Sequence, residues 1–234
     1  MFLSFEHRAS TSPYVECVWR CRSEFGGSFF SMAESNIELV ITRLPGLSAV
    51  TLRGPVTRAK LVECPPEGEW LAIRFRLGAY FPRLPTSALL DHQDLQLPVH
   101  GPRHFWFSGL SWEIPQFDNA ETFVERLVRA GVLARSHAAE AVQEGDVDWM
   151  SQRSVQRHFA RATGLTLSSH QRIERARHAA GLLTAGRSIL DATFEAGYFD
   201  QAHLTRSIKD LVGMTPAQLI REQPQLSFSY KTPD

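Results

Sequence analysis

Residues 188–216 read SILDATFEAGYFDQAHLTRSIKDLVGMTP, and this stretch decides the fold of the C-terminal part of the chain. Ser188 and Asp200 are residue types that cap the N-termini of helices, whereas Gly197 suits a tight turn. The stretch therefore predicts a helix over Ile189–Ala196, a turn at Gly197 and a second helix that follows Asp200. Two short helices joined by a glycine-containing turn form the helix-turn-helix pattern.

The second helix of this pattern occurs twice in the chain. Residues 152–166, QRSVQRHFARATGLT, align without a gap with residues 201–215, QAHLTRSIKDLVGMT. The matched pairs are Gln152 with Gln201, Val155 with Leu204, Arg157 with Arg206, Phe159 with Ile208, Gly164 with Gly213, Leu165 with Met214 and Thr166 with Thr215. Each copy has an N-cap residue before it, an apolar pair four residues apart and a glycine after its last turn. A repeated supersecondary unit indicates two copies of one task.

The face of each repeated helix opposite its apolar pair is polar and cationic, as a DNA-reading helix requires. Such a helix places its N-terminal side chains in the major groove, where Arg and Gln form paired hydrogen bonds with bases. Helix N-termini and neighbouring polar side chains hold phosphates. The competing interpretation is a solvated surface face. The residues expected at DNA phosphates are Ser151, Gln152, Ser188, His203 and Lys209.

A longer helix over residues 168–185 is predicted between the two copies. Ser168 and Gln171 form a capping-box pattern at its start, and Gly186 suits its end. Its 18 residues, at about 1.5 Å each, span roughly 27 Å, compared with about 34 Å between successive major-groove segments. We therefore expect some bending of the DNA. A last helix is predicted to begin at Pro216.

The charge of the chain is divided unevenly, although its formal sum is zero. Residues 1–150 contain 14 Lys and Arg against 18 Asp and Glu (net −4), whereas residues 151–222 contain 10 against 6 (net +4). A basic C-terminal part is typical of a protein that binds nucleic acid. The sequence has no apolar run long enough for a membrane span and no signal-peptide pattern, so the cytoplasm is the expected compartment.

The N-terminal part alternates between apolar and polar residues with a period of two, which is typical of half-buried strands. Strands are predicted over residues 14–22, 36–43 and 69–77. Several short strands separated by Gly- and Pro-containing turns predict an antiparallel β-barrel or sandwich, and the whole chain is thus α+β. Residues 98–118 are expected to be irregular. Helices are predicted over residues 120–130 and 134–143.

Residues 151–219 resemble the DNA-binding domain of the AraC/XylS family of bacterial transcription regulators. The resemblance is carried by SQRSVQRHFARATGLT, by RARHAAGLL and by SILDATFEAGYFDQAHLTRSIKDLVGMTPAQL. It implies an all-α domain of seven helices with two helix-turn-helix units. The base-reading positions that it implies are Arg153, Gln156, Arg157, Gln201, Ala202, Thr205 and Arg206. The chain departs from the family pattern at residues 143–151, QEGDVDWMS, where a first helix and its turn are usual, and at Ala202, where a longer polar residue is common.

The N-terminal part, including SPYVECVW, IRFRLGAY and FWFSGLSWEIPQF, is similar to a sensor-type domain that precedes this DNA-binding domain in some family members. The similarity implies a cupin-like barrel that serves effector binding or dimerisation. The predicted domains are a β-rich sensor or dimerisation domain (1–118), a linker helix (119–133), the DNA-binding domain (134–223) and a C-terminal tail (224–234).

Four residues are candidates for lining a small-molecule pocket: Trp19, Trp70, Arg74 and Trp106. Aromatic side chains line such pockets, and an arginine there can meet an anionic ligand. The competing interpretation places the aromatic residues in the core and Arg74, with Arg76, on a solvated strand face. Cys17 and Cys21 are expected to be core residues, because four strand residues span roughly 13 Å, which is too far for one metal. No catalytic site, metal or cofactor is predicted.

The sequence as a whole predicts a one-component transcription regulator that joins a sensor or dimerisation domain to a DNA-binding domain. The expected partners are double-stranded DNA, a small-molecule effector, a second copy in a homodimer and RNA polymerase. A dimer surface is expected on the helix over 120–130, where Phe123, Leu127 and Val128 share a face. Two alternatives remain open: a regulator controlled by its abundance alone, and a cupin-like enzyme or repair protein that carries the same DNA-binding module.

Overall fold

The computed structural model describes residues 3–91, 94–144 and 151–222, and the chain divides into two compact units. Unit 1 comprises Met1–Gly26, Ser35–Pro55 and Pro65–Thr166. Unit 2 comprises Gly27–Glu34, Val56–Cys64 and Leu167–Asp234. Two segments from the N-terminal half of the sequence therefore belong to the same unit as the C-terminal helices.

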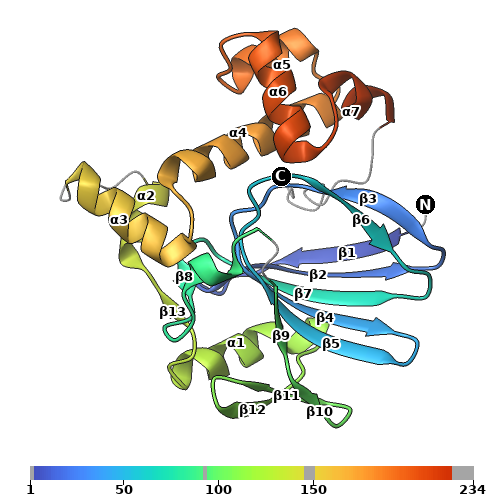
Figure 1. Cartoon of the computed structure of the whole chain (residues 1–234), viewed down its shortest axis with the longest axis vertical. Helices are drawn as coiled ribbons and strands as arrows, with labels where there is room; N and C mark the ends of the chain where they lie inside the picture. The colour runs from blue at the N-terminus through green and yellow to red at the C-terminus, as the bar shows by residue number, and fades with distance from the viewer. Residues whose placement is uncertain (1–2, 92–93, 145–150, 223–234) are drawn as a thin grey trace. The chain divides into compact units, whose positions relative to one another are not determined.

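Unit 1 is built on a six-stranded antiparallel sheet (Figure 1). Its strands, in spatial order, are β1 (Leu3–Ala9), β2 (Val15–Ser23), β7 (Glu69–Phe75), β4 (Glu38–Leu44), β5 (Leu47–Arg53) and β9 (Leu95–Leu97). The three predicted strands are β2, β7 and β4, which lie side by side at the centre of the sheet. The predicted antiparallel, β-rich architecture is confirmed, and the described strands form an open sheet with β1 and β9 at its edges.

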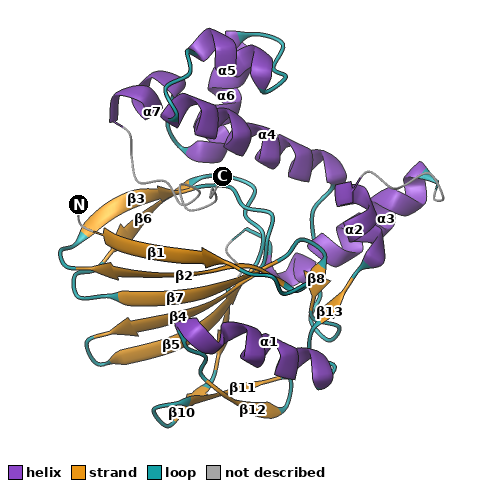
Figure 2. Cartoon of the chain, turned by 180° about the vertical axis from the view of Figure 1, so that it is seen from behind, coloured by secondary structure: helices purple, strands orange, loops and turns teal. Residues whose placement is uncertain are grey.

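One face of this sheet forms the core of unit 1. Leu39, Ile73 and Phe75 project from it and are almost fully buried. Helix α1 (Ala120–Arg129) covers this face (Figure 2), and its Phe123 and Leu127 are 4% and 1% exposed. Burying a large apolar side chain contributes about 1.5–3 kcal/mol, so α1 is bound firmly by its apolar stripe. The prediction that this stripe forms a dimer surface is wrong, because the sheet already covers it.

Residues 98–118, predicted to be irregular, instead contain a three-stranded sheet. Its strands are β10 (Val99–His100), β11 (His104–Phe107) and β12 (Leu110–Glu113), and the 3-10 helix η2 (Phe117–Asn119) follows. Ser108 and Gly109 have φ angles of 52° and 78° and make a two-residue hairpin turn. Phe105, Phe107 and Trp112 alternate into the core of unit 1, and this burial fixes the register.

Five further elements complete the part of unit 1 that matters for function. The helix predicted over 134–143 is α2 (His137–Glu144), and it begins later than predicted because Ala134–Arg135 forms strand β13, which pairs with β8 (Ala79–Tyr80). The 3-10 helix η1 spans Thr86–Leu89. Helix α3 (Gln152–Thr163), the first copy of the repeat, also lies in unit 1.

Unit 2 combines four helices with a two-stranded ribbon. The helices are α4 (Leu167–Thr184), α5 (Ile189–Glu195), α6 (Gln201–Val212) and α7 (Pro216–Glu222), and α4 packs against the other three. The ribbon consists of β3 (Gly27–Ser31) and β6 (Lys60–Cys64). The predicted domains are continuous along the chain, whereas these units are discontinuous, because Ala33 and Ala59, which flank the ribbon, are hydrogen-bonded to α6. The predicted tail, 224–234, lies outside the described residues.

A bidentate ion pair attaches α1 to the edge strand of the sheet. Arg8 Nη1 and Nη2 lie 2.5 and 2.7 Å from the two carboxylate oxygens of Glu121, and Nη2 also donates to the carbonyl of Phe117 at 2.6 Å. The hydrogen bonds from Arg8 lower the pKa of Glu121 from its ordinary value of 4.5 to about 2. The folded chain therefore binds this proton more weakly than the unfolded chain does.

We predict that Glu121→Gln reduces the free energy of unfolding near neutral pH by about 1–2 kcal/mol, allowing for the partial exposure of both side chains. A lowered pKa stabilises the fold fully above the unfolded value of 4.5, and this stabilisation is lost as the pH falls towards 2. Urea unfolding at about pH 6 and about pH 3 should therefore show a smaller pH dependence for Glu121→Gln than for the unsubstituted chain. Glu125→Gln, which removes an exposed pair with Arg129, is the control. Equal pH dependence in all three proteins would contradict the prediction.

Candidate nucleic-acid interface

Both copies of the repeat form 12-residue helices with the predicted caps. In α3, Ser151 Oγ accepts a hydrogen bond from the backbone N–H of Ser154 at 3.3 Å. In α6, the carboxylate of Asp200 accepts one from the N–H of His203 at 2.6 Å. Gly164 and Gly213 end the two helices with φ angles of 74° and 91°, a left-handed conformation that favours glycine. The sequence repeat is therefore also a structural repeat.

The two helices bury one face and expose the other. The apolar pairs are at most 5% exposed, as predicted: Val155 with Phe159, and Leu204 with Ile208. The predicted base-reading side chains are exposed, apart from the half-buried Thr205: Arg153, Gln156, Arg157, Gln201, Ala202 and Arg206. Among the described residues, Arg153, Arg157 and Arg206 form no ion pair, so their guanidinium groups are available to an external anion or base.

The predicted phosphate contacts are also on the surface: Ser151, Gln152, Ser188, His203 and Lys209 are all exposed. The hydroxyl of Ser188 is already engaged as the N-cap of α5. It accepts from the N–H of Asp191 at 3.1 Å and lies 2.7 Å from the Asp191 carboxylate. A carboxylate at this place opposes a phosphate, so Ser188 is the least favourable member of the set.

Segments of the N-terminal half hold α3 in place within unit 1. Helix α3 packs against α2, η1 and β8. Thr86 Oγ1, from η1, donates to the carbonyl of Ala162 at 3.0 Å, and Thr86 is 2% exposed. A Cβ atom added to Gly164 would lie 3.1 Å from the backbone of Thr86 and Ser87. The end of α3 is therefore closely packed against η1.

Helix α6 is held in a corresponding way within unit 2. The N–H groups of Ala33 and Ala59 donate to the carbonyls of Leu211 and Asp210, at 2.8 and 2.9 Å. The last carbonyls of a helix have no partner within it, so these two bonds satisfy groups that would otherwise need water. A Cβ atom on Gly213 would lie 2.3 Å from the ring of Phe30 in the ribbon. The ribbon therefore packs against the end of α6 and helps to hold this helix in place.

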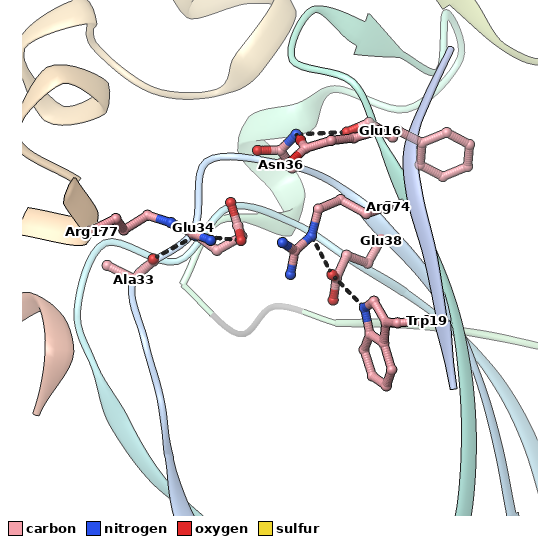
Figure 3. A network of polar contacts seen from close by, with 9 residues as sticks. Glu16, Trp19, Ala33, Glu34, Asn36, Glu38, Arg74 and Arg177 are labelled. Carbon is pink, nitrogen blue, oxygen red and sulfur yellow. Dashed lines mark hydrogen bonds and ion pairs between the residues drawn. The ribbon is translucent and has the colours of Figure 1, made fainter. Parts of the chain in front are cut away.

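A buried ion pair fixes the ribbon to α4. Arg177 Nη1 contacts the carboxylate of Glu34 and lies 3.3 Å from the carbonyl of Ala33 (Figure 3). The side chain of Arg177 is 6% exposed and that of Glu34 is 13% exposed. Sequence reasoning missed Arg177, although it lies four residues after Ile173, on the apolar stripe of α4. A charged residue on an apolar stripe is the signal that points to a buried partner.

The four predicted ligand-pocket residues do not form one site. Glu38 brings two of them together, since it accepts from Trp19 Nε1 at 3.2 Å and from Arg74 Nε at 2.7 Å (Figure 3). Arg74 is 5% exposed, so the alternative of a solvated strand face is wrong for this residue. Trp70 lines an open cleft of about 680 Å³ at one end of the sheet, and Trp106 is 47% exposed on β11, stacked on His100.

Comparison with protein families agrees with the geometry of the C-terminal part. Residues 149–222 match the family described as "Helix-turn-helix domain". The C-terminal part of the chain contains a helix-turn-helix domain. No curated protein sequence matches the chain.

Two structures of ToxT from Vibrio cholerae are similar to the chain at low identity. The first, at 1.65 Å resolution, has a TM-score of 0.42 and 10% identity, and the match covers 93% of this chain and 98% of that one. The second, from Vibrio cholerae O395, has a TM-score of 0.40 and 12% identity, and covers 93% of this chain and 97% of that one. TM-scores in this range assign neither a fold nor a ligand to the chain. The helix-turn-helix match over residues 149–222 supports a DNA-binding regulator of transcription. No helix among the described residues is long and apolar enough to cross a membrane.

We predict that the C-terminal helix-turn-helix domain is destabilised more by Gly213→Ala than by Gly186→Ala. Both glycines have left-handed φ angles, 91° and 88°, but a Cβ atom meets the Phe30 ring at Gly213 and nothing within 4 Å at Gly186. Gly186→Ala should cost about 1 kcal/mol from the backbone alone, and Gly213→Ala a further 1–3 kcal/mol, roughly, from overpacking.

Urea unfolding of the full chain measures both effects. Phe30→Ala in the Gly213→Ala background should remove most of the difference between the two glycine variants, when each is compared with its own parent. Equal costs at Gly186 and Gly213 would show that the ribbon does not pack against the end of α6.

Proposed function

We propose that the chain reads a specific DNA sequence through α3 and α6, each of which places its exposed face in the major groove. The observation that carries the proposal is the pair Arg157 and Arg206. They occupy the same position in the two copies, they are exposed, and neither has an ion-pair partner in the part of the chain that the structure describes. If these faces were only solvated surfaces, nothing would require an unpaired arginine at the same position of both copies.

The side chains proposed to read bases have suitable chemistry. Arg153, Arg157 and Arg206 present forked donors that match the O6 and N7 atoms of guanine. Gln156 and Gln201 match the N6 and N7 atoms of adenine in the same way. The remaining two positions, Ala202 and Thr205, offer methyl groups that suit the methyl group of thymine. The proposed phosphate contacts then set the register of each helix on the duplex.

The proposal gives unit 1 the role of a sensor or dimerisation unit within a one-component regulator. Support comes from the contacts of α3, which is held by η1 and β8 of the same unit, so that a change in unit 1 acts on a recognition helix directly. A homodimer, a contact with RNA polymerase and a cytoplasmic location belong to the same proposal. Since the apolar stripe of α1 lies in the core, a dimer has to use another surface.

The decisive experiment measures binding of the full chain to a labelled fragment of the DNA upstream of its own gene, against unrelated competitor DNA, over a range of salt concentrations. We expect specific binding that weakens steeply with salt. Arg157→Ala and Arg206→Ala should each lose about 1–3 kcal/mol of specific binding. Arg129→Ala, which removes the same charge from an exposed site on α1, is the control and should bind as the unsubstituted chain does.

Equal binding to all DNA, unaffected by either arginine variant, would count against the upstream fragment as a target. A selection of bound fragments from the whole genome then decides the question. If that selection also returns no preferred sequence, the proposed function is wrong.

A further inference from the structure

A cleft of about 360 Å³ lies in unit 2, beside the exposed face of α6. Helices α4 and α6, which pack side by side (Figure 1), form its walls together with the turn before α6. Its basic lining residues are Arg172, Arg175, His203 and Arg206. Arg206 is also one of the proposed base-reading residues, so the cleft adjoins the face that we place in the major groove.

The charge of this cleft is positive. Three arginines line it, whereas Asp210 is the one carboxylate among its described lining residues. Asp210 lies 3.5 Å from Arg172 and 3.7 Å from Arg58, so it offsets part of the charge. Arg175 and Arg206 form no ion pair within residues 3–91, 94–144 and 151–222. A concave site with more guanidinium groups than carboxylates favours an anion.

An aromatic ring supports Arg175 in this cleft. The guanidinium of Arg175 lies over the ring of Tyr198, 5.7 Å from its centroid, and the hydroxyl of Tyr198 bonds to Ser207 at 2.9 Å. Tyr198 is 4% exposed, and burial raises the pKa of its phenol, so this wall carries no negative charge near neutral pH. A guanidinium over a ring keeps its N–H donors available to an oxygen ligand. The ring therefore supports Arg175 without neutralising it.

The first copy of the repeat carries its cations at this edge on the recognition helix itself. The cleft-lining positions of α6 are 203, 206, 207 and 210, and the matching residues of α3 are Ser154, Arg157, His158 and Arg161. Where α3 has Arg161, α6 has Asp210, and a carboxylate alone would repel a phosphate. Arg172 and Arg175 of α4 reverse the sign of the charge at this edge. Helix α4 thus supplies the positive charge that the first copy carries on its own helix.

We propose that this cleft binds a phosphate group of the DNA backbone, and that Arg172 and Arg175 are the residues of α4 that hold it. This inference rests on the proposed function, because it adds a backbone contact to the DNA interface of α6. A helix in the major groove lies between two sugar–phosphate strands, and the edge beside its base-reading face meets one of them. Guanidinium groups match phosphate oxygens in geometry and charge. Such a contact fixes the position of Arg206 along the groove and reads no sequence itself.

Binding of the full chain to two duplexes, its preferred fragment and an unrelated sequence, tests the site over a range of salt concentrations. The loss of one phosphate contact lowers the slope of log affinity against log salt by about 0.9. We expect Arg172→Gln and Arg175→Gln each to lower the slope by this amount and to weaken both duplexes equally, by roughly tenfold at low salt. Arg175→Lys keeps the charge and should restore most of the slope. Arg187→Gln, which removes an exposed arginine of unit 2 beside Glu195, is the control.

The outcomes separate this inference from the proposed function. Unchanged slopes in both α4 variants would overturn the site, and a sequence preference that depends on Arg206 would still support the proposed function. A loss confined to the preferred fragment would show that Arg175 reads a base, which also overturns the site. If both duplexes are weakened equally but the chain prefers no sequence, the site stands and the proposed function fails. A chain that binds neither duplex would overturn both.

Inorganic phosphate, titrated into the full chain by calorimetry without DNA, tests the other source of the same anion. We expect no saturable binding of phosphate, because a single free ion lacks the neighbouring contacts that the DNA backbone makes with α6. Saturable binding that Arg175→Gln abolishes, together with unchanged DNA slopes, would assign the cleft to a free phosphate and overturn the DNA contact.

Discussion

One carbonyl group near the end of each recognition helix depends on a donor from the N-terminal half of the chain. Ala162 in α3 and Leu211 in α6 occupy the same position of the repeat, 49 residues apart. The first accepts from the hydroxyl of Thr86, and the second from the backbone N–H of Ala33. A 12-residue helix is only marginally stable in water by itself, so each copy needs contacts with residues outside the helix. The two donors belong to different kinds of segment, but both bind the carbonyl oxygen at the same position of the repeat.

The segments that hold α6 in place include a buried ion pair, and such a pair contributes to stability differently from an apolar contact. Removing Arg177 and Glu34 from water costs several kcal/mol per ion, and two nitrogen atoms of Arg177, Nε and Nη2, have no hydrogen-bond acceptor among the described residues. A pair of this kind adds little net stability compared with an apolar contact of the same shape. Loss of one partner is nevertheless severe, at about 3–5 kcal/mol, because an uncompensated charge remains buried.

Local signals in the sequence were sufficient for the helices, and long-range contacts were not visible in it. Caps, terminating glycines and apolar pairs all lie within one turn of the residues that they control, and the structure confirms them in both copies. The bond from Arg177 to Ala33 joins residues 144 positions apart, and no periodicity in either segment predicts it. The placement of β3 and β6 with the C-terminal helices was missed for the same reason.

The mistakes in the N-terminal part have a different origin. The hairpin at Ser108 and Gly109 has a recognisable two-residue turn and alternating residues on both sides, but a density of aromatic residues obscured that pattern. Arg74 was a candidate for a ligand pocket, with a solvated strand face as the alternative, whereas its partner Glu38 lies on a strand that adjoins it only in the folded sheet. Alternation identifies the two faces of a strand, but it does not say whether the second face meets water.

The two copies differ at the position of Arg161 in α3 and Asp210 in α6, which we call the flank of each helix. This difference shows which requirements apply to the flank and which apply to the rest of the helix. The apolar stripe, the caps and the arginine of the exposed face are retained, since every recognition helix needs a core contact, defined ends and a base-reading side chain. The flank is not subject to these requirements, and the residue there depends on the segment against which each helix packs. In α6 it meets Arg172 of α4 and Arg58, and a carboxylate at position 210 neutralises these cations. In α3 it meets the segment Tyr80–Ser87, which contains Arg83 and no acidic residue, and the corresponding position carries Arg161. The carboxylate at position 210 is therefore explained by the two arginines that it meets in unit 2, which α3 does not meet in unit 1.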